Sequence, residues 1–410
     1  MNMLIKYEFL KIVRKKSTLI VMGISLLLTA FLFGLPILQF QTYNQEGAIK
    51  GFEGIAYEKE QYKEQSVPLT NEFVEKNIAQ YQTLFENPAN VGYDGNEKFL
   101  IGDVYWNYVA PREKLLSIIA SIYDSPNENS GLNKLPELDL TKSAQFDQTR
   151  NEKIEALLNM PSRNMSTKQK EYWSHMNSQV KTPLQYGYHE GWEVILSNFE
   201  LLIFAILAIC IVIAPVFSGE YQAGTDAVIL SSKYGKTKLG TAKIIASLLF
   251  GILAFTLHII VAFGLPLAAF GVDGWNLPLQ IADPIIPYPY SFLQATLINL
   301  GVIYLVLIAM ISLTLLLSAK MKNPYLVLIV LVPILFIPLF LSPNGTTGAY
   351  NLTLFLLPYR STMPEIGKYI SYPIGDMVFD VLSIRAILYI ILSSVIMLLA
   401  RFTFMKHQVA

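Results

Sequence analysis

The sequence predicts an all-α membrane protein with six transmembrane helices, and its composition, its apolar runs and its charge distribution all support this fold class. Of 410 residues, 53% are hydrophobic and only 15% are charged, whereas a soluble domain carries about 25% charged residues. The apolar runs have the length that a helix needs to cross about 30 Å of hydrocarbon. Six such runs in one chain argue against a soluble protein with buried helices. The expected spans are 18–38, 200–218, 244–270, 292–319, 325–341 and 385–404.

The first apolar run, 18–38, follows a basic segment and therefore needs comparison with a signal peptide. A cleaved apolar region is about 7–15 residues long, and this run is longer. No pattern of small residues typical of a cleavage site follows it. We interpret the run as a membrane-spanning helix that is retained.

Basic residues concentrate in the segments that six spans would place on one side of the membrane. These segments are 1–17, 219–243, the turn at 320–322 and the residues from 401 to the end of the chain. The last of these includes the end of the sixth expected span and the tail 405–410 that follows it. Together they hold 13 basic and 3 acidic residues, which leaves 18 basic and 28 acidic residues elsewhere. Lys and Arg accumulate in cytoplasmic loops. We therefore expect both termini in the cytoplasm of a cell, on the inner face of its plasma membrane.

The segment 39–198 differs in composition from the spans, because it contains 15 basic and 22 acidic residues. Apolar residues recur in it with helical spacing, and Ser166 with Gln169 forms the pattern of a capping box that opens a helix over 167–180. The sequence predicts a mainly helical extracytoplasmic domain. The periodic residues are Val74, Ile78, Tyr81 and Phe85, followed by Leu115, Ile119 and Ile122.

A second external segment, 343–384, is too interrupted to contain a span. The run 352–357 is apolar but short, and 375–383 is amphipathic. Neither is long enough to cross a bilayer. We expect short interfacial helices here.

Within the spans, His258 is the only ionisable residue near a helix centre. Transporters driven by ion gradients place ionisable groups at membrane depth, so this scarcity disfavours ion coupling. A single histidine beside Thr256 is more often a residue that hydrogen bonds between helices than a proton carrier. We keep His258 as a candidate residue of a transport pathway beside that simpler interpretation.

The chain has no recognisable site for a nucleotide, a metal or a catalytic nucleophile. Gly235, Lys236 and Thr237 resemble the end of a phosphate-binding loop, but Leu230 occupies the position where that motif requires glycine. The histidines are scattered, and Cys210 is the one cysteine, so disulfides play no part. We expect no cofactor in this chain, no enzyme activity of its own and no nucleic-acid partner.

The loop 219–243 carries the most specific pattern in the sequence. An acidic residue is followed by Gly-Thr, an apolar pair, a polar basic turn and a lysine that opens the next span. The residues are Glu220, Gly224, Thr225, Ile229, Leu230, Lys233 and Lys243. This loop resembles the connection between the second and third spans of the ABC-2 family of exporter permeases. The segment 1–17, with Glu8, Lys11 and Arg14, is similar to the amphipathic elbow helix of that family.

The resemblance implies a permease subunit that works as a pair, with an identical copy or a sister permease, on two cytoplasmic ABC ATPases that hold ATP and Mg²⁺. It implies that the loop docks on an ATPase, with Glu220 at the start of a short coupling helix. The simpler alternative is that Glu220 and Thr225 only cap a surface helix. A pathway between subunits would include the helix with Pro333 and Pro338, and its apolar lining would suit a hydrophobic or amphipathic peptide, lipid or drug.

A different class of protein also fits part of the pattern. A non-transporting membrane sensor would bind a ligand or partner with its external domain and relay the signal through its helices. Such proteins typically have four spans, so the number of spans distinguishes the two hypotheses. A membrane-embedded enzyme is a weaker third possibility, because no catalytic set is visible. The absence of cysteine pairs suits a bacterial membrane.

Overall fold

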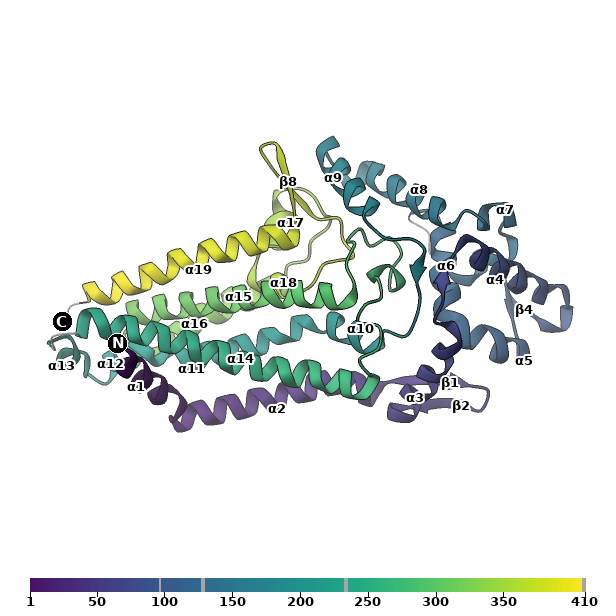
Figure 1. The fold of residues 1–410 in the computed structure, drawn as a ribbon. Coiled ribbons are helices and arrows are strands. Elements are labelled where there is room, and N and C mark those ends of the chain that lie inside the picture. Colours follow the sequence, from purple (N-terminus) through teal and green to yellow (C-terminus); the bar gives the residue numbers. More distant parts are fainter. Residues whose placement is uncertain (96, 127–129, 232–234, 408–410) are drawn as a thin grey trace.

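The computed structural model describes residues 1–95, 97–126, 130–231 and 235–407. Figure 1 shows an elongated molecule, in which a bundle of long helices carries a separate group of short helices and hairpins at one end. Both chain termini lie at the opposite end of the bundle, beside α1 (Asn2–Val13) and α13 (Asp226–Ser231).

Five helices in the described part of the chain are long and apolar enough to cross a membrane. They confirm five of the expected spans to within a few residues at most ends, although the third begins earlier, at Thr237. The first is Lys16–Gln39 (α2), and the second is Phe199–Gln222, which comprises a short turn, α11 (Ile203–Ile213) and α12 (Pro215–Gln222). The third is Thr237–Phe270, mainly α14 (Gly240–Phe270). The fourth is Phe292–Lys320 (α15) and the fifth is Val381–Lys406 (α19).

The expected span at 325–341 is a shorter helix. It comprises α16 (Pro324–Phe336) and one tight turn, Ile337–Leu339. Pro333 lies inside α16, and Pro338 lies in the tight turn that follows it. Proline has no N–H to continue the helical hydrogen bonds, so regular helix ends early. Sixteen residues reach about 24 Å, less than the hydrocarbon thickness of about 30 Å.

The inner face of α2 carries small polar residues along most of its length and the apolar residues Phe33 and Ile37 near its end. Thr18, Ser25 and Thr29 are buried, whereas Leu27 and Phe31 on the same helix are exposed. In lipid, apolar side chains gain nothing by leaving the bilayer, and small polar residues allow helices to approach closely. The face of α2 with Thr18, Ser25 and Thr29 therefore packs on the bundle, and most of its large apolar residues point outward.

His258 connects α14 to α2. Its Nδ1 lies 2.8 Å from the carbonyl oxygen of Ala254, which can only accept a hydrogen bond, so Nδ1 carries the proton. The hydroxyl of Ser25 then donates to Nε2 over 2.9 Å. The side chain thus occupies the structural role that the sequence favoured for it, in a fully buried position.

The group of short elements at the far end of the bundle comes from residues 41–197. Its helices include α3 (Gly51–Tyr62), α4 (Asn71–Thr83), α6 (Glu113–Tyr123), α8 (Phe146–Asn159), α9 (Thr167–Ser178) and α10 (Glu190–Ser197). Its strands form three antiparallel pairs: β1–β2 (Gln41–Asn44, Gly47–Lys50), β3–β6 (Pro68–Leu69, Leu184–Gln185) and β4–β5 (Val91–Asp94, Glu97–Leu100).

The helical periodicities of this region are confirmed. The predicted apolar residues of α4 and α6 are buried on the inner faces of these helices, except that Phe85 falls in the tight turn after α4. The capping box at Ser166 is present, with the Gln169 side chain accepting from the Ser166 backbone over 3.1 Å. The helix α9 ends two residues before the predicted end.

The segment after α16 differs from the prediction in one element. Two short helices are present, α17 (Ala349–Leu354) and α18 (Pro358–Ser361). The amphipathic stretch 375–383 is not a helix, and that prediction is wrong. It contributes β8 (Met377–Asp380) to a hairpin with β7 (Ser371–Ile374), and α19 begins directly afterwards. Gly375 has φ +60° at the first position of the two-residue turn, a conformation that hairpin turns require and that favours glycine.

Arg385, near the start of α19, fixes this external segment to the bundle. The side chain is fully buried, and its three guanidinium nitrogens donate to the carbonyl oxygens of Phe355, Met363 and Arg360 over 2.8–2.9 Å. These carbonyls lie just after α17, within α18 and just after α18, where helices of four to six residues leave few backbone donors for them. One side chain therefore joins both short helices to α19.

We predict that Arg385→Met destabilises the protein by about 2–4 kcal/mol, because buried carbonyls left without a donor each cost about 1–3 kcal/mol. Cys210 is buried and is the only cysteine, so its reaction with a maleimide dye reports thermal unfolding in detergent. Arg401→Met, an exposed position on the same helix, is the matched control and should unfold like the wild type. Equal midpoints for the two variants would contradict this role of Arg385.

Candidate functional site

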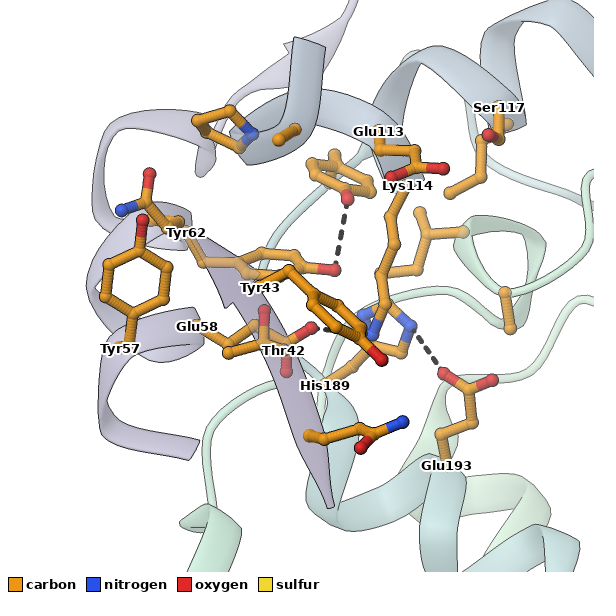
Figure 2. Close-up of a pocket in the computed structure, with 18 of the residues that line it drawn as sticks. Thr42, Tyr43, Tyr57, Glu58, Tyr62, Glu113, Lys114, Ser117, His189 and Glu193 are labelled. Carbon is orange, nitrogen blue, oxygen red and sulfur yellow. Dashed lines mark hydrogen bonds and ion pairs between the residues drawn. The ribbon is translucent and has the colours of Figure 1, made fainter. Parts of the chain in front are cut away.

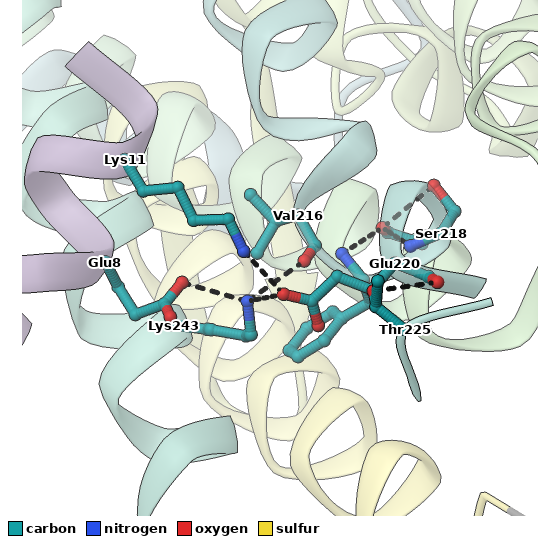
Figure 3. Close-up of polar contacts among 9 residues, drawn as sticks. Glu8, Lys11, Val216, Ser218, Glu220, Thr225 and Lys243 are labelled. Atoms are coloured by element: carbon teal, nitrogen blue, oxygen red, sulfur yellow. Dashed lines mark hydrogen bonds and ion pairs between the residues drawn. The ribbon is translucent and has the colours of Figure 1, made fainter. Parts of the chain in front are cut away.

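The end of the bundle that carries both termini contains a cluster of buried ion pairs. The helix α1 lies across this end, beside α14 and α12. Glu8 and Lys11 are three residues apart in α1, so they share one helical face. That face points toward α12 and α14 (Figure 3).

Lys243, in the first turn of α14, is the centre of the cluster. Its side chain is 1% exposed, and Nζ donates to Glu8 Oε2 over 2.9 Å and to Glu220 Oε1 over 2.7 Å. The carbonyl of Val216 lies 3.4 Å from the same nitrogen. An ammonium group has three donors, and each of the three has an acceptor here (Figure 3).

Glu220 carries the second half of the cluster. Its Oε1 also accepts a hydrogen bond from Lys11 Nζ over 2.7 Å. Partial burial disfavours the charge on Lys11, but the hydrogen bond and the negative charge of Glu220 outweigh it and raise the pKa of Lys11 above its usual value. The cluster therefore holds two carboxylates and two ammonium groups. A buried ion pair is tolerated only when charges and hydrogen bonds balance in this way.

The helix α12 is braced by a serine from α15. The second span breaks between Ile213 and Pro215. Ser318 on α15 donates its hydroxyl hydrogen to the Ala214 carbonyl over 2.6 Å and accepts from the backbone N–H groups of Phe217 and Ser218 over 3.1 and 3.0 Å. A single hydroxyl thus satisfies backbone groups on both sides of the break and joins the two helices.

Glu220 does not begin a helix, and that prediction is wrong. It lies in the last turn of α12 and is buried. The helix continues past it because the first residue that can terminate it is Gly224, with φ +64°. The N–H of Gly224 donates to Tyr221 and the N–H of Thr225 donates to Glu220, which is the hydrogen-bond pattern of a glycine-terminated helix.

The short helix of the loop is α13, and it begins at Asp226. Asp226 is paired with the His407 ring over 3.0 Å, and that ring stacks on Tyr221 with centroids 4.1 Å apart. The hydrogen bond from His407 lowers the pKa of Asp226. These contacts join α13 to the end of α19.

Val228 is an apolar residue of α13 that faces away from the protein, with 75% of its surface exposed. Ile229 and Leu230 belong to the backbone of α13, but their side chains and all of Lys233 lie outside the described residues. A short helix with an exposed apolar residue, held by ion pairs at its base, has the form of a docking element.

The structure therefore brings Glu8, Lys11 and Glu220 together and leaves other candidates elsewhere. Arg14 follows α1 and is exposed, outside the cluster. His258 lies on the contact between α14 and α2, and the two prolines lie in and after α16.

Sequence reasoning named Lys243 only as the lysine that opens the third span and gave it no role in the site, although a lysine in the first turn of an apolar span signals that a buried partner is needed. It also missed Ser318 and the pair Asp226–His407, for which the linear sequence offers no signal because the partners are far apart in the chain.

Long apolar helices with polar groups satisfied between them define this chain as an integral membrane protein of the helical, multi-span class. A model of the ABC-2 family of transporter proteins matches residues 2–406, and the chain belongs to this family. It is thus a membrane permease of an ABC transporter, and the family implies partnership with an ABC ATPase. No curated protein and no solved structure shows a significant match to the chain.

We predict that Lys243→Met costs about 3–5 kcal/mol of stability, because it leaves the Glu8 and Glu220 carboxylates without their buried cation. The maleimide reaction of Cys210 measures the effect. Lys6→Met, which removes an exposed lysine from α1, is the control and should stay within about 0.5 kcal/mol of the wild type. A Lys243→Met protein that melts with the control would show that the cluster contributes no stability.

Proposed function

We propose that the chain is the membrane-spanning subunit of an ATP-driven exporter and that α13 is the element on which a separate ATPase acts. The cargo is a hydrophobic or amphipathic molecule such as a peptide, lipid or drug, and ATP and Mg²⁺ bind in the ATPase. The observation that carries the proposal is the position of α13. It projects at the end of the bundle while ion pairs at its base join it to the helices (Figure 1, Figure 3).

The connections of α13 suit the transmission of force. On one side, Asp226 contacts the end of α19 through His407. On the other, the turn at Gly224 joins α13 to α12, where Glu220 holds α1 and α14 by two ion pairs of 2.7 Å. Movement of α13 would therefore reach four helices at once. In this proposal Glu220 keeps a role in coupling, as the residue that holds the base of α13 and not as a contact of the ATPase.

The remaining predicted residues of the loop belong to the docking surface. Gly224 and Thr225 form the turn that orients α13. Ile229, Leu230 and Lys233 supply further apolar and basic contacts to the ATPase beside Val228. An exposed apolar residue on a short helix is the kind of group that a protein partner covers.

We further propose six crossings with both termini in the cytoplasm, in which α16 and the turn after it form the fifth. The excess of Lys and Arg in the segments beside the termini supports this orientation. The domain from 39 to 198 and the segment 343–384 are then extracytoplasmic. A span shorter than the bilayer is accommodated by local thinning or by packing against other helices.

The permease works as a pair in this proposal, either of two copies or with a sister permease. Exposed apolar residues on α2, α16 and α19 give the bundle faces that contact lipid or a second subunit. The broken helix with Pro333 and Pro338 lies among these faces. His258 is buried between α14 and α2, so it would affect a pathway only by positioning these helices.

The sensor hypothesis is less well supported. It expects four spans, and five long apolar helices are present among the described residues. The transporter hypothesis accounts for all five and for the shorter helix.

Val228→Asp should reduce ATP hydrolysis at least about fivefold when the chain is co-expressed with the ABC ATPase encoded beside it and reconstituted in lipid, because the charge opposes burial of α13 in the ATPase. Val272→Asp, at an exposed valine next to α14 at the opposite end of the bundle, is the matched control. If the Val228→Asp complex assembles and hydrolyses ATP at the wild-type rate, the ATPase does not act on α13. Cargo movement by the purified chain without any ATPase would remove the ATP-driven mechanism altogether.

The six-span topology makes a separate prediction in intact cells. In a Cys210→Ser background, Ser342→Cys should react with a membrane-impermeant maleimide from outside, whereas Lys322→Cys should react only after permeabilisation. Asp94→Cys in the large domain is the positive control for external labelling. Reaction of Lys322→Cys in intact cells would contradict the six-span arrangement.

A further inference from the structure

The domain of short elements contains a cavity of about 810 Å³ next to the bundle. It lies between α3, the strand β1, the segment around α6 and the start of α10 (Figure 2). Ligand pockets typically measure about 300–1,000 Å³, so the cavity has room for a drug-sized molecule. Its walls are rich in aromatic rings, namely Tyr43, Tyr57, Tyr62, Tyr105, Trp106 and Tyr186.

Negative charge predominates in and around this cavity. Lys114 Nζ lies 2.9 Å from Glu58 Oε1 and 2.8 Å from Glu190 Oε2, so a single ammonium is shared by two carboxylates. Two further carboxylates, Glu113 and Glu193, line the cavity. The cavity and its immediate surroundings therefore hold four carboxylates and one ammonium group. His189, which pairs with Glu193 over 3.1 Å, adds a positive charge only when it is protonated.

Glu58 is a largely buried carboxylate whose charge is only partly compensated. Its Oε2 atom is buried and has no hydrogen-bond partner among the described residues. Burial raises the pKa of Glu58 above its usual value, and Lys114 only partly opposes this effect. A buried acceptor without a donor costs free energy, so a positively charged ligand would relieve an existing deficit.

The aromatic rings near Glu58 are held in fixed positions. Tyr62 stacks on Tyr186 with centroids 5.6 Å apart, and the Tyr186 hydroxyl donates to the Tyr62 hydroxyl over 3.2 Å. Trp106 meets Tyr105 edge to face at 5.0 Å. Faces of Tyr and Trp attract organic cations, and the attraction increases when water is excluded.

We propose that this cavity is a binding site for an organic cation that joins an ammonium-type charge to an apolar or aromatic body. The excess of carboxylates disfavours an anion. A bare metal ion is also disfavoured, because no group of three or more His, Cys, Asp or Glu in the described part of the chain is arranged to hold one. The aromatic side chains of the walls are not metal ligands, but they can pack against an organic group.

A second cavity extends this site toward the membrane spans. It measures about 540 Å³ and shares Glu193 and Ala282 with the first. Leu196 and Phe292, which lie where the second and fourth spans begin, line it together with Glu365. An amphipathic cation can therefore place its charge near Glu58 and its apolar part toward the bilayer. Binding needs neither the ATPase nor transport, so this inference stands apart from the proposed function.

The test is calorimetric titration of the full-length chain in detergent at neutral pH with three small probes of different charge: benzylammonium, benzyl alcohol and benzenesulfonate. These probes share a benzene ring, are soluble in water and do not form micelles. We expect measurable binding of the cation and at least about fivefold weaker binding of the other two. Equal or tighter binding of benzenesulfonate, or no binding of the cation, overturns the proposal.

Two variants locate the site. Glu58→Gln should weaken binding of the cation at least about fivefold, and Trp106→Leu should weaken it about threefold or more. The matched control is Glu60→Gln on the same helix, whose carboxylate is exposed and pairs with Lys63; it should bind like the wild type. The Cys210 reaction confirms that each variant is folded. Wild-type affinity in both folded variants overturns the assignment to this cavity.

Discussion

The buried ammonium group of Lys243 is the constraint on which the end of the bundle near the termini depends. A charge with 1% exposure is stable only if opposite charges reach it, and the carboxylates that do so come from α1 and α12. The N-terminal helix must therefore fold back onto the bundle, and the second span must continue as helix to Glu220. The placement of α13 follows from these two requirements, because Gly224 terminates the helix directly after the ion pair.

The same requirement for satisfied polar groups explains the irregular parts of the bundle. Where Pro215 interrupts the second span, Ser318 supplies the missing hydrogen bonds from another helix. Where the chain after α16 forms only short helices and turns, Arg385 donates to three of its carbonyls. Away from water an unsatisfied backbone group costs several kcal/mol. At each irregular site, a side chain from one helix therefore also joins that helix to a neighbouring segment. Such connections allow a movement of one helix to be transmitted to the next.

The two ends of the molecule have different chemistry. Near the termini the charges are balanced, two carboxylates against two ammonium groups, and their effect is to join helices. In the distal domain the charges are unbalanced around an aromatic cavity, and one oxygen of Glu58 has no hydrogen-bond partner in the part of the chain that the structure describes. This domain is also attached to the outer part of the bundle, since Trp173 donates to Ser371 in the hairpin before α19. A cluster with equal numbers of positive and negative charges stabilises the fold. A cavity with an excess of negative charge favours binding of a positively charged ligand.

The sequence by itself determined the long apolar helices and the helices α4, α6 and α9, because hydrophobic length, periodicity and capping are properties of neighbouring residues. Local patterns also set the wrong expectations. The apolar residues of the stretch 375–383 are spaced like one face of a helix, but the turn at Gly375 and the pairing with β7 make Met377–Asp380 a strand. Glu220 was recognised as important, yet only the tertiary structure decided that its carboxylate pairs with Lys11 and Lys243. The pair Asp226–His407 and the cavity around Glu58 were likewise decided by tertiary structure, because they join residues that are distant in sequence and become neighbours only when the chain has folded.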